Sequence, residues 1–355
     1  MSVEAFHGGA FFDAIGVDLR HLERSESVIS ADVLDAWFDP SPRVIAALRE
    51  YLPFLLRTSP PNHAEGFVEE VARWREVPAE CVLPGSGSSS LLFACLPRLL
   101  RPGCRAMLLD PMYSEYEHII GDLLQGEVLR HALSEERDFE VNPETLLEGV
   151  CRLRPDAVLL VNPNNPTGQL WPRAGILSFL DQVPPEILIV VDETYLEYVG
   201  ASESLEGEAA RRRNLVVIKS MSKVYALSGA RVAYLVAHPE IAANLRPWLP
   251  PWPVGLLAQA AAMEALRDPG YYAARYAETH SLRADLAARL AHLSPCPSRA
   301  NYFLVRPPDA AALAARLRRR DIFLREFRSG LLAGRCLRIS VKNAAQNVRL
   351  VEALS

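Results

Sequence analysis

The chain has 355 residues, of which half are hydrophobic and 23% are charged, and its formal net charge is −5. This composition is that of a globular protein rather than a disordered one, and the negative charge argues against nucleic acid as a partner. No apolar run approaches the length of a membrane span, and the N-terminus lacks a signal-peptide pattern. The six cysteines form no C-x-x-C pair and have no metal-ligand spacing with histidine. We therefore expect a cytoplasmic protein without a membrane partner or a metal site.

The pattern of elements predicts an α/β protein with two domains and an N-terminal segment. Residues 43–250 alternate short apolar strands with helices of about 10–15 residues, which predicts a mostly parallel sheet with helices on both faces. After a proline-rich break, residues 251–355 show long alanine-rich helices and then strand, helix, strand, strand and helix, which predicts a smaller α+β domain. Residues 1–42 have an irregular pattern and are expected to lie near the functional site, against the small domain or the cleft.

In chain order, helices are predicted over 42–56, 63–75 and 89–100, and two longer ones over 254–267 and 270–293. The strands predicted for the large domain span residues 81–83, 106–109, 157–161, 187–191, 215–218 and 232–236. Ligands bind at the carboxyl ends of the strands in open α/β sheets. The residues that follow each strand are therefore the first candidates for a site.

Two polar motifs follow the first two strands. Gly85-Ser86-Gly87-Ser88-Ser89 opens a helix, where backbone N–H groups and hydroxyls can form a phosphate cradle. The same residues can also be an ordinary turn that caps the helix. Tyr113, in the stretch Asp110–Tyr116, can stack on a flat ring or can be a core aromatic, and the residues alone leave both interpretations open.

The next two strands end in a rigid loop and in a carboxylate. Asn162-Pro163-Asn164-Asn165-Pro166-Thr167-Gly168 contains two prolines and a glycine, so a side chain such as Asn165 is held in place. Asp192, in the motif Asp192–Tyr195, ends an apolar strand and is costly to bury without a cation. A protonated pyridine nitrogen would supply that cation, whereas an exposed Asp192 would simply cap a helix.

A lysine motif follows the strand predicted over 215–218. Lys223 ends the run Ser220-Met221-Ser222-Lys223, and Gly229 and Arg231 follow a few residues later. A lysine amine can form a Schiff base with an aldehyde cofactor, and the serines with Arg231 can hold a cofactor phosphate. Taken alone, such a lysine is more often a solvated surface charge.

The order of these motifs resembles that of one family. Reading along the chain gives G-S-G-S, P-x-Y, N-N-P-T-G, D-E-x-Y, S-x-S-K and G-x-R. This order is similar to the aminotransferase class I/II family of pyridoxal-phosphate enzymes, fold type I, over most of the chain. Within the family, the resemblance is closest to the branch of histidinol-phosphate aminotransferases and threonine-phosphate decarboxylases. The segments that carry it are His7–Gly9, Pro251–Val254, Arg299–Tyr302, Arg338-Ile339 and Ala344–Asn347.

The resemblance implies roles for the residues on the cofactor side. Lys223 holds pyridoxal 5′-phosphate as a Schiff base and, once the substrate releases it, acts as base and acid at the substrate Cα and at C4′ of the cofactor. Asp192 pairs with the pyridinium nitrogen, and Tyr113 stacks on the ring. Tyr195 and Asn165 bond the phenolic oxygen of the ring. The residues implied around the cofactor phosphate are Ser86, Gly87, Ser88, Ser220, Ser222 and Arg231.

On the substrate side, the resemblance implies Arg338 as the group that grips the α-carboxylate, a role suited to its planar fork. Arg325 is a further candidate, for a distal anionic group. We also expect Asn165, His7 and Asp32 to contact the substrate.

The sequence departs from the family pattern at two positions. Ser59-Pro60 stands where family members carry a tyrosine-proline pair that reaches the partner subunit's site, so that phosphate contact is lost or replaced. Asp32 stands where a neutral amide is expected. Asp32 either lies beside the substrate and favours a cationic one, or it points to solvent or caps a turn.

The resemblance implies a homodimeric enzyme whose small-molecule substrate is an α-amino acid. Transamination is the leading reaction, and the alternative is a lyase reaction, either decarboxylation or β/γ elimination or replacement. From Asp32 and Ser59 we expect a substrate other than histidinol phosphate or threonine phosphate, such as a cationic or bulky amino acid of a biosynthetic pathway. A non-catalytic protein that binds pyridoxal phosphate is less favoured, because Lys223, Asp192 and Asn165 are all intact.

Overall fold

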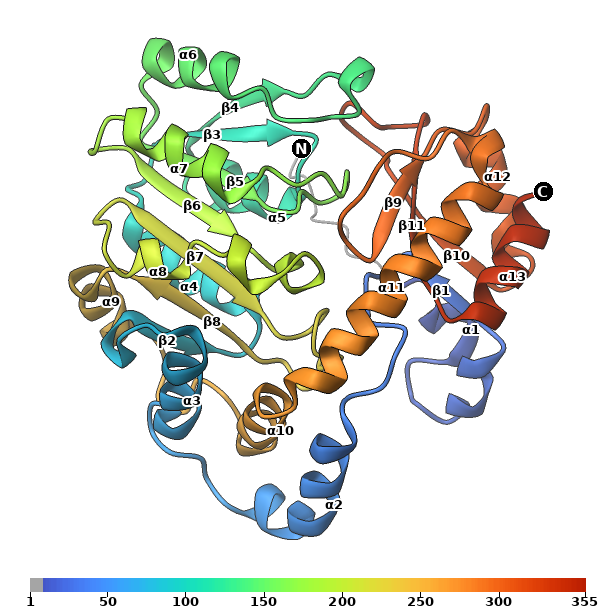
Figure 1. Ribbon diagram of the computed structural model, residues 1–355, viewed down its shortest axis with the longest axis horizontal. Helices are drawn as coiled ribbons and strands as arrows, with labels where there is room; N and C mark the ends of the chain where they lie inside the picture. The colour runs from blue at the N-terminus through green and yellow to red at the C-terminus, as the bar shows by residue number, and fades with distance from the viewer. Residues whose placement is uncertain (1–8) are drawn as a thin grey trace.

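The computed structural model describes residues 9–355 and shows a large α/β domain beside a smaller domain (Figure 1). The large sheet has the strand order β2-β8-β7-β6-β5-β3-β4, and all neighbours are parallel except in the pairs that β8 forms. Its strands are β2 (Val82–Gly85), β3 (Arg105–Asp110), β4 (Glu127–Ala132), β5 (Ala157–Val161), β6 (Leu188–Asp192), β7 (Leu215–Ser220) and β8 (Ala233–Ala237). The predicted α/β class and mostly parallel sheet are confirmed.

Helices cover both faces of this sheet, because the strand residues alternate between two hydrophobic cores. In β5, Val158 and Leu160 belong to one core, whereas Leu159 and Val161 belong to the other. The first core is completed by α3 (Glu65–Arg75), α6 (Pro143–Leu153), α7 (Arg173–Gln182), α8 (Glu206–Ala209) and α10 (Leu256–Leu266). The second core is completed by α4 (Ser88–Leu99), α5 (Ser114–Glu117) and α9 (Pro239–Leu245).

A four-stranded sheet of order β1-β10-β11-β9 forms the smaller domain. Its strands are β1 (Ile29–Ala31), β9 (Tyr302–Val305), β10 (Ile322–Glu326) and β11 (Leu337–Ser340). They share a core with α12 (Ala310–Arg318), α13 (Ala344–Leu354) and the end of α11 (Pro269–Arg289), while α1 (Phe12–Ile15) packs beside β10.

Two helices connect or flank the domains. The long helix α11 runs from the large domain to the smaller one, and α2 (Pro42–Arg57) packs against α10 at the lower edge of the large domain (Figure 1). Ser41 caps α2 by accepting the N–H of Val44 at 3.4 Å, and Pro42 begins the helix. Within residues 9–355, no helix is long and apolar enough to cross a membrane.

The sequence predicts neither β4 nor β1, whereas the other strands of the large sheet begin and end within about two residues of their predicted bounds. β4 is an edge strand that pairs only with β3, so it mixes charged and apolar residues and lacks a clear pattern. β1 has three residues, too few for a periodic pattern, and lies in the segment predicted to be irregular. It pairs in parallel with β10, a partner distant in the sequence, and this pairing corrects that prediction.

Candidate active site

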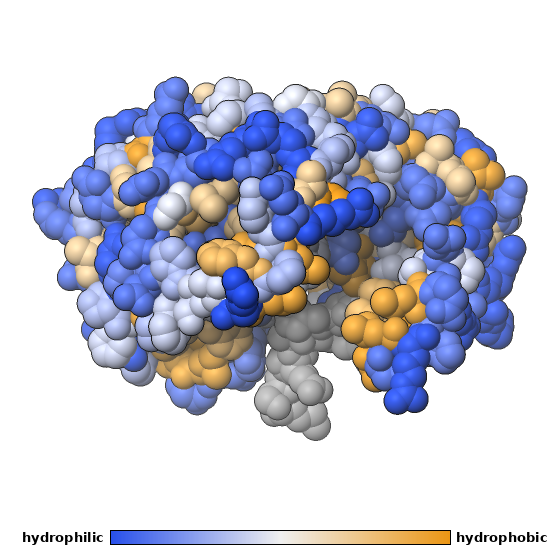
Figure 2. All heavy atoms as spheres, turned by 90° about the horizontal axis from the view of Figure 1, so that it is seen from below, coloured by the Kyte–Doolittle hydropathy of each residue, from blue (hydrophilic) through white to orange (hydrophobic). Residues whose placement is uncertain are grey.

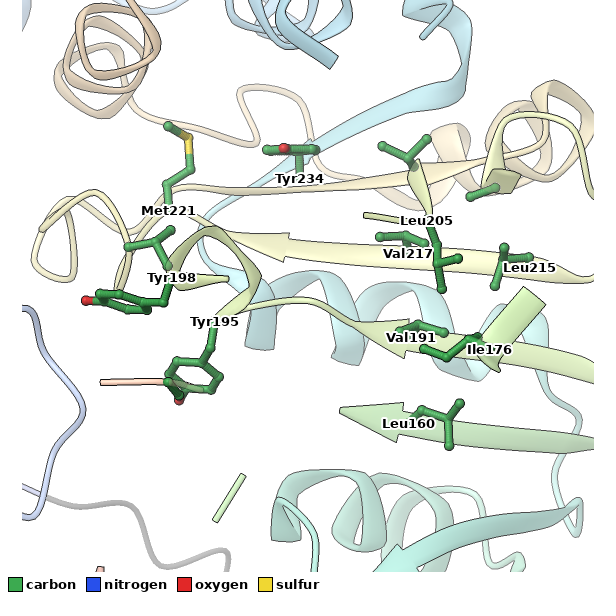
Figure 3. Packing of buried hydrophobic residues seen from close by; sticks show 14 of the residues in the cluster. Leu160, Ile176, Val191, Tyr195, Tyr198, Leu205, Leu215, Val217, Met221 and Tyr234 are labelled. Carbon is green, nitrogen blue, oxygen red and sulfur yellow. The ribbon is translucent and has the colours of Figure 1, made fainter. Parts of the chain in front are cut away.

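The carboxyl ends of β5, β6 and β7 bring three of the predicted motifs to one edge of the large sheet. Asn165 follows β5, Asp192 ends β6, and Lys223 follows β7. Figure 3 shows Tyr195 beyond the arrowheads of these strands, while residues such as Val191 pack along the strands in the core. The residues with the chemistry therefore lie where the parallel sheet ends.

Lys223 lies on the turn after β7 and is held by a carboxylate. Its Nζ is 2.6 Å from Asp35 Oδ1 and 3.4 Å from the Ser228 hydroxyl. The Tyr198 hydroxyl donates to the Lys223 carbonyl at 2.9 Å, which fixes the backbone of the turn. Burial tends to raise the pKa of Asp35, but the charge of Lys223 and the hydrogen bonds from Lys223 and Ser228 outweigh it, and the pKa is lowered. Because 20% of the Lys223 side chain is exposed, the amine is accessible to a ligand.

Asp192 is buried at the end of β6. Its Oδ1 accepts hydrogen bonds from the Thr194 N–H at 2.9 Å and from the Thr194 hydroxyl at 2.5 Å, and its Oδ2 accepts from the Tyr116 hydroxyl at 3.0 Å. Burial raises the pKa of Asp192, and these hydrogen bonds oppose the rise only in part. In the described part of the chain, no cationic side chain pairs with this carboxylate. A protonated ring nitrogen would therefore be stabilised here.

Asn165 links Tyr195 to a buried arginine. Its Nδ2 lies 3.5 Å from the Tyr195 hydroxyl, and its Oδ1 accepts from Arg338 Nη1 at 2.6 Å. Arg338 Nη2 donates to the Asp32 carbonyl at 2.8 Å, while its buried Nε has no hydrogen-bond partner among the described residues. Burial lowers the pKa of Arg338, so its charge gains from an added anion. This guanidinium suits a carboxylate ligand.

The glycine-serine turn meets Arg231 at the start of α4. Gly87 has a φ of +90°, and a Cβ there would lie 2.3 Å from Arg231 Nη2, so the position requires glycine. Arg231 Nη1 lies 3.4 Å from the Ser222 hydroxyl and 3.1 Å from the Ser228 carbonyl. The Ser222 N–H donates to Ser220 Oγ at 3.3 Å. A helix N-terminus, two hydroxyls and a guanidinium together form a cradle for an anion.

Ser86, Ser88 and Tyr113 lie at the same edge of the sheet. Ser88 is the first residue of α4, and the Ser86 hydroxyl donates to the Pro253 carbonyl at 2.6 Å. Tyr113 precedes α5 and packs edge-on against Tyr116, with ring centroids 6.3 Å apart. Tyr116 donates a hydrogen bond to Asp192, so the side chain of Tyr116 links the Tyr113 ring to that carboxylate.

On the substrate side, Asp32 makes contacts that the sequence does not predict. The carboxylate is buried, and its Oδ2 accepts from the N–H groups of Gly9 at 2.9 Å and Ala10 at 3.3 Å. Asp32 therefore holds the backbone of Gly9 and Ala10 close to the end of β1. Arg325 lies on β10, where burial and the nearby charge of Arg338 lower its pKa to about 10.

Three residues of the site were not singled out by the sequence motifs: Asp35, Ser228 and Lys342. Lys342 follows β11, and burial lowers its pKa to about 8 although Asp35 and Asp32 oppose this. Asp35 could have been identified from its position three residues after Asp32, in a stretch whose sequence departs from the family pattern. Of the remaining candidates, Ser59 is exposed between α2 and α3, and His7 lies outside the described residues.

A cluster of five buried ionisable side chains lies beneath the site. Lys219 Nζ is 3.2 Å from Glu193 Oε2, 2.9 Å from Glu197 Oε1 and 3.8 Å from Glu206 Oε2. Arg75 pairs with Glu197, and its Nε lies 3.4 Å from Glu206 Oε2. Burial disfavours the charge on Lys219, but the three carboxylates outweigh burial and raise its pKa. Because Glu193 follows β6 and Lys219 lies on β7, this cluster joins the two strand ends that carry the site.

Comparisons with known proteins point to one family. The family model for aminotransferase class I and II matches residues 32–354. A histidinol-phosphate aminotransferase of Symbiobacterium thermophilum is 32% identical over 326 residues, which cover 89% of this chain and 86% of that protein. The structure of the Sinorhizobium meliloti histidinol-phosphate aminotransferase in complex with pyridoxal-5′-phosphate has a TM-score of 0.85 at 23% identity and covers 99% of this chain and 94% of that one. The L-threonine-O-3-phosphate decarboxylase of Porphyromonas gingivalis has a TM-score of 0.80 at 24% identity and covers 92% of this chain and 98% of that one.

The residues at this edge of the sheet suit the parts of pyridoxal phosphate. Asp192 offers a buried carboxylate for a ring nitrogen, the turn at Gly87 offers a cradle for a phosphate with Arg231, and Lys223 offers an amine for an aldehyde. The family match covers most of the chain, and it confirms the resemblance seen in the motifs. The chain therefore belongs to the aminotransferase class I and II family of pyridoxal-phosphate enzymes.

Proposed function

We propose that the protein is an aminotransferase that acts on an α-amino acid in a biosynthetic pathway, with Lys223 as the residue bonded to the cofactor. The observation that carries the proposal is that Arg338, on β11 of the smaller sheet, contacts Asn165 at the edge of the large sheet that also carries Lys223 and Asp192. Arg338 is buried and reaches Tyr195 through Asn165, so a carboxylate bound to it is held beside the ring-binding residues. This geometry suits an α-amino acid better than an amine without a carboxylate.

The chain's own residues orient the substrate and move its protons. When bound, the cofactor supplies an electron sink for the bond that breaks at the substrate Cα. Lys223 Nζ would take the proton from the substrate Cα and deliver it to carbon C4′ of the cofactor, and the second half-reaction would reverse this transfer. Burial raises the pKa of Tyr195, so its hydroxyl keeps its proton near neutral pH and would donate a hydrogen bond to a bound cofactor, while it accepts one from Asn165 Nδ2. A protonated ring nitrogen of the cofactor would favour the ionised form of Asp192.

Replacing Asp192 by asparagine is expected to weaken cofactor binding without weakening the fold. The pKa of Asp192 in the folded chain is raised above 3.8. The contribution of Asp192 to the stability of the cofactor-free fold is therefore complete below pH 3.8, its ordinary pKa, and is lost as the pH rises through the higher pKa of the folded state. At pH 7 the neutral amide should leave thermal stability without cofactor equal or higher. Cofactor affinity should fall about 10- to 100-fold, because a charged hydrogen bond of about 1.5–3 kcal/mol is lost.

Thermal unfolding of the cofactor-free protein and a fluorescence titration with pyridoxal phosphate measure the two effects of this variant. A drop in stability with unchanged affinity would contradict the role proposed for Asp192. A matched control is Asp181→Asn, which changes an exposed carboxylate on the same domain and should alter neither quantity.

We propose a substrate without a phosphate group, with a cationic or bulky side chain. Asp35, an acidic residue on the substrate side, supports this proposal, as does Ser59 at the position of the family's tyrosine. The Asp32 carboxylate does not support it, because it accepts hydrogen bonds from the N–H groups of Gly9 and Ala10. Histidinol phosphate is the competing candidate, because the relatives named above carry that activity in their names. Arg325 also favours it, because a guanidinium near Arg338 can bind a distal anion.

A substrate panel tests the proposed reaction. The purified enzyme with cofactor is incubated with single amino acids, with histidinol phosphate and with threonine phosphate, while the cofactor spectrum and the products are followed. Conversion to pyridoxamine phosphate with a keto product is the expected result for a non-phosphorylated amino acid. Release of carbon dioxide or of a side-chain fragment would instead indicate the lyase alternative. Efficient turnover of either phosphorylated compound would contradict the proposed substrate, and no reaction with any compound would indicate a non-catalytic protein.

We also propose a homodimer whose interface includes α2. The second half of this helix exposes Tyr51 (52%), Leu52 (43%), Phe54 (49%) and Leu56 (65%). Figure 2 shows hydrophobic side chains gathered on the face seen from below, the side on which α2 lies in Figure 1. Clustered exposed apolar side chains of this kind mark a docking surface. Ser59, at the position where the family contacts the partner subunit, lies two residues after the end of α2.

Replacing Leu56 by aspartate is therefore expected to convert the dimer to a monomer. A charge buried in an apolar interface costs several kcal/mol, enough to weaken association by more than about 100-fold. Analytical ultracentrifugation at micromolar concentration measures the change. Val348→Asp is the matched control, because Val348 on α13 is also exposed (39%) and should leave the dimer intact. A parent protein that sediments as a monomer would overturn the proposed dimer.

A further inference from the structure

Asp35 is a carboxylate to which neither the motifs nor the family resemblance assigns a role, yet it contacts Lys223. Its Oδ1 lies 2.6 Å from Lys223 Nζ and 2.6 Å from the Ser228 hydroxyl. Its Oδ2 has no hydrogen-bond partner among the described residues. Ser228 also lies 3.0 Å from the Ser222 carbonyl, which ties this contact to the turn after β7. Because 41% of the Asp35 side chain is exposed, the carboxylate is anchored at one oxygen and accessible at the other.

The position of Asp35 is on the substrate side of the site. It stands in the stretch between β1 and α2, shortly after Asp32, whose carbonyl accepts a hydrogen bond from Arg338 Nη2. This stretch therefore contacts both the arginine proposed for the α-carboxylate and the lysine proposed for the cofactor. A substrate bound to Arg338 and placed beside Lys223 would lie along the stretch from Asp32 to Asp35.

Lys223 is the lysine that Asp35 contacts directly, at 2.6 Å. Lys342 is the other lysine whose charge reaches Asp35, but it is buried (8% exposed) and makes no hydrogen bond with it. A cation that approaches the accessible oxygen of Asp35 would take over its charge and weaken its hold on Lys223.

We propose that Asp35 binds a cationic group on the substrate side chain and that this contact selects the substrate. The inference rests on the proposed aminotransferase function and adds a substrate class, an α-amino acid with an ammonium or guanidinium group in its side chain. A phosphate at the same place would meet the negative charge of Asp35 and be rejected.

Matched pairs of amino acids test this proposal. L-lysine and L-ornithine are compared with L-norleucine and L-norvaline, which lack the terminal ammonium, in the cofactor-loaded parent, Asp35→Asn and Asp35→Glu proteins. Asp39→Asn is the matched control, because Asp39 is an exposed carboxylate in the same stretch without a contact to Lys223. Titration of the cofactor absorbance gives the dissociation constant of each amino acid, and steady-state rates give kcat and KM.

The parent is expected to prefer the cationic member of each pair in both kcat and affinity. Asp35→Asn should reduce that preference about 10- to 100-fold, the effect of losing one charged hydrogen bond. Asp35→Glu should keep part of it, and Asp39→Asn should change it less than about twofold.

Two outcomes would overturn the inference while leaving the aminotransferase proposal intact. Equal losses for both members of each pair in Asp35→Asn would show that Asp35 only positions Lys223. A parent that prefers neutral or phosphorylated amino acids would show that Asp35 does not select a cation. If the parent acts on no amino acid at all, the proposed function fails and the inference fails with it.

Discussion

Replacing Lys223 by alanine is expected to abolish covalent attachment of pyridoxal phosphate and to lower the transamination rate by about 10²- to 10⁴-fold or more, the range of a positioned general base. The alanine removes the only amine within bonding distance of Asp35 Oδ1 among the described residues, so neither the covalent link nor the proton transfer at Cα has a substitute. The visible absorbance of the bound cofactor and the steady-state rate measure the two losses.

A second variant separates the chemistry of Lys223 from its charge. Lys223→Arg keeps a cation that can pair with Asp35, so the fold should be as stable as in the parent, but a guanidinium does not form a Schiff base at neutral pH. It should therefore be as inactive as the alanine variant. Substantial activity in either variant would mean that another residue bonds the cofactor, and the whole assignment of the site would be wrong.

Replacing Lys219 by methionine is expected to destabilise the protein by about 3–5 kcal/mol, the usual cost of removing one partner from a buried ion pair. Lys219 is 2% exposed and lies within 4 Å of three carboxylates, which Arg75 alone would then have to neutralise. The repulsion would act on Glu193, next to the residue proposed for the ring nitrogen. We therefore expect weaker cofactor binding together with the lower free energy of unfolding measured by urea denaturation.

Arg213→Met is the control for Lys219→Met, because it also replaces a cation by methionine. Arg213 pairs with Glu240, but the two side chains are 70% and 59% exposed. An exposed ion pair contributes at most about 1 kcal/mol, so this variant should unfold almost like the parent. Similar losses in the two variants would show that the buried cluster does not support the site.

The cofactor side of the candidate site could be predicted because its residues follow strands whose apolar runs are clear in the sequence. Once the strands before Asn165, Asp192 and Lys223 are recognised, parallel pairing alone brings the three residues to one edge. The order of the motifs along the chain then predicted the family, and the match of the family model to residues 32–354 confirmed it.

The substrate side could not be predicted in the same way, because its contacts join segments far apart in the chain. Asp35 reaches Lys223 only because the stretch after β1 crosses from the smaller domain to the large one. Asp32 looked like a substrate ligand by position, yet its carboxylate binds the N–H groups of Gly9 and Ala10. Neither contact leaves a periodic signal in the sequence.

The sequence by itself determined the fold class, the order of the site motifs and the residue types that suit pyridoxal phosphate, since all of these depend on local patterns of apolar and polar residues. Only the tertiary structure decided which charges meet: Asp35 with Lys223, and Lys219 with its three glutamates. The physical reason is that an ion pair depends on the distance between two side chains in space, and the sequence alone does not specify that distance.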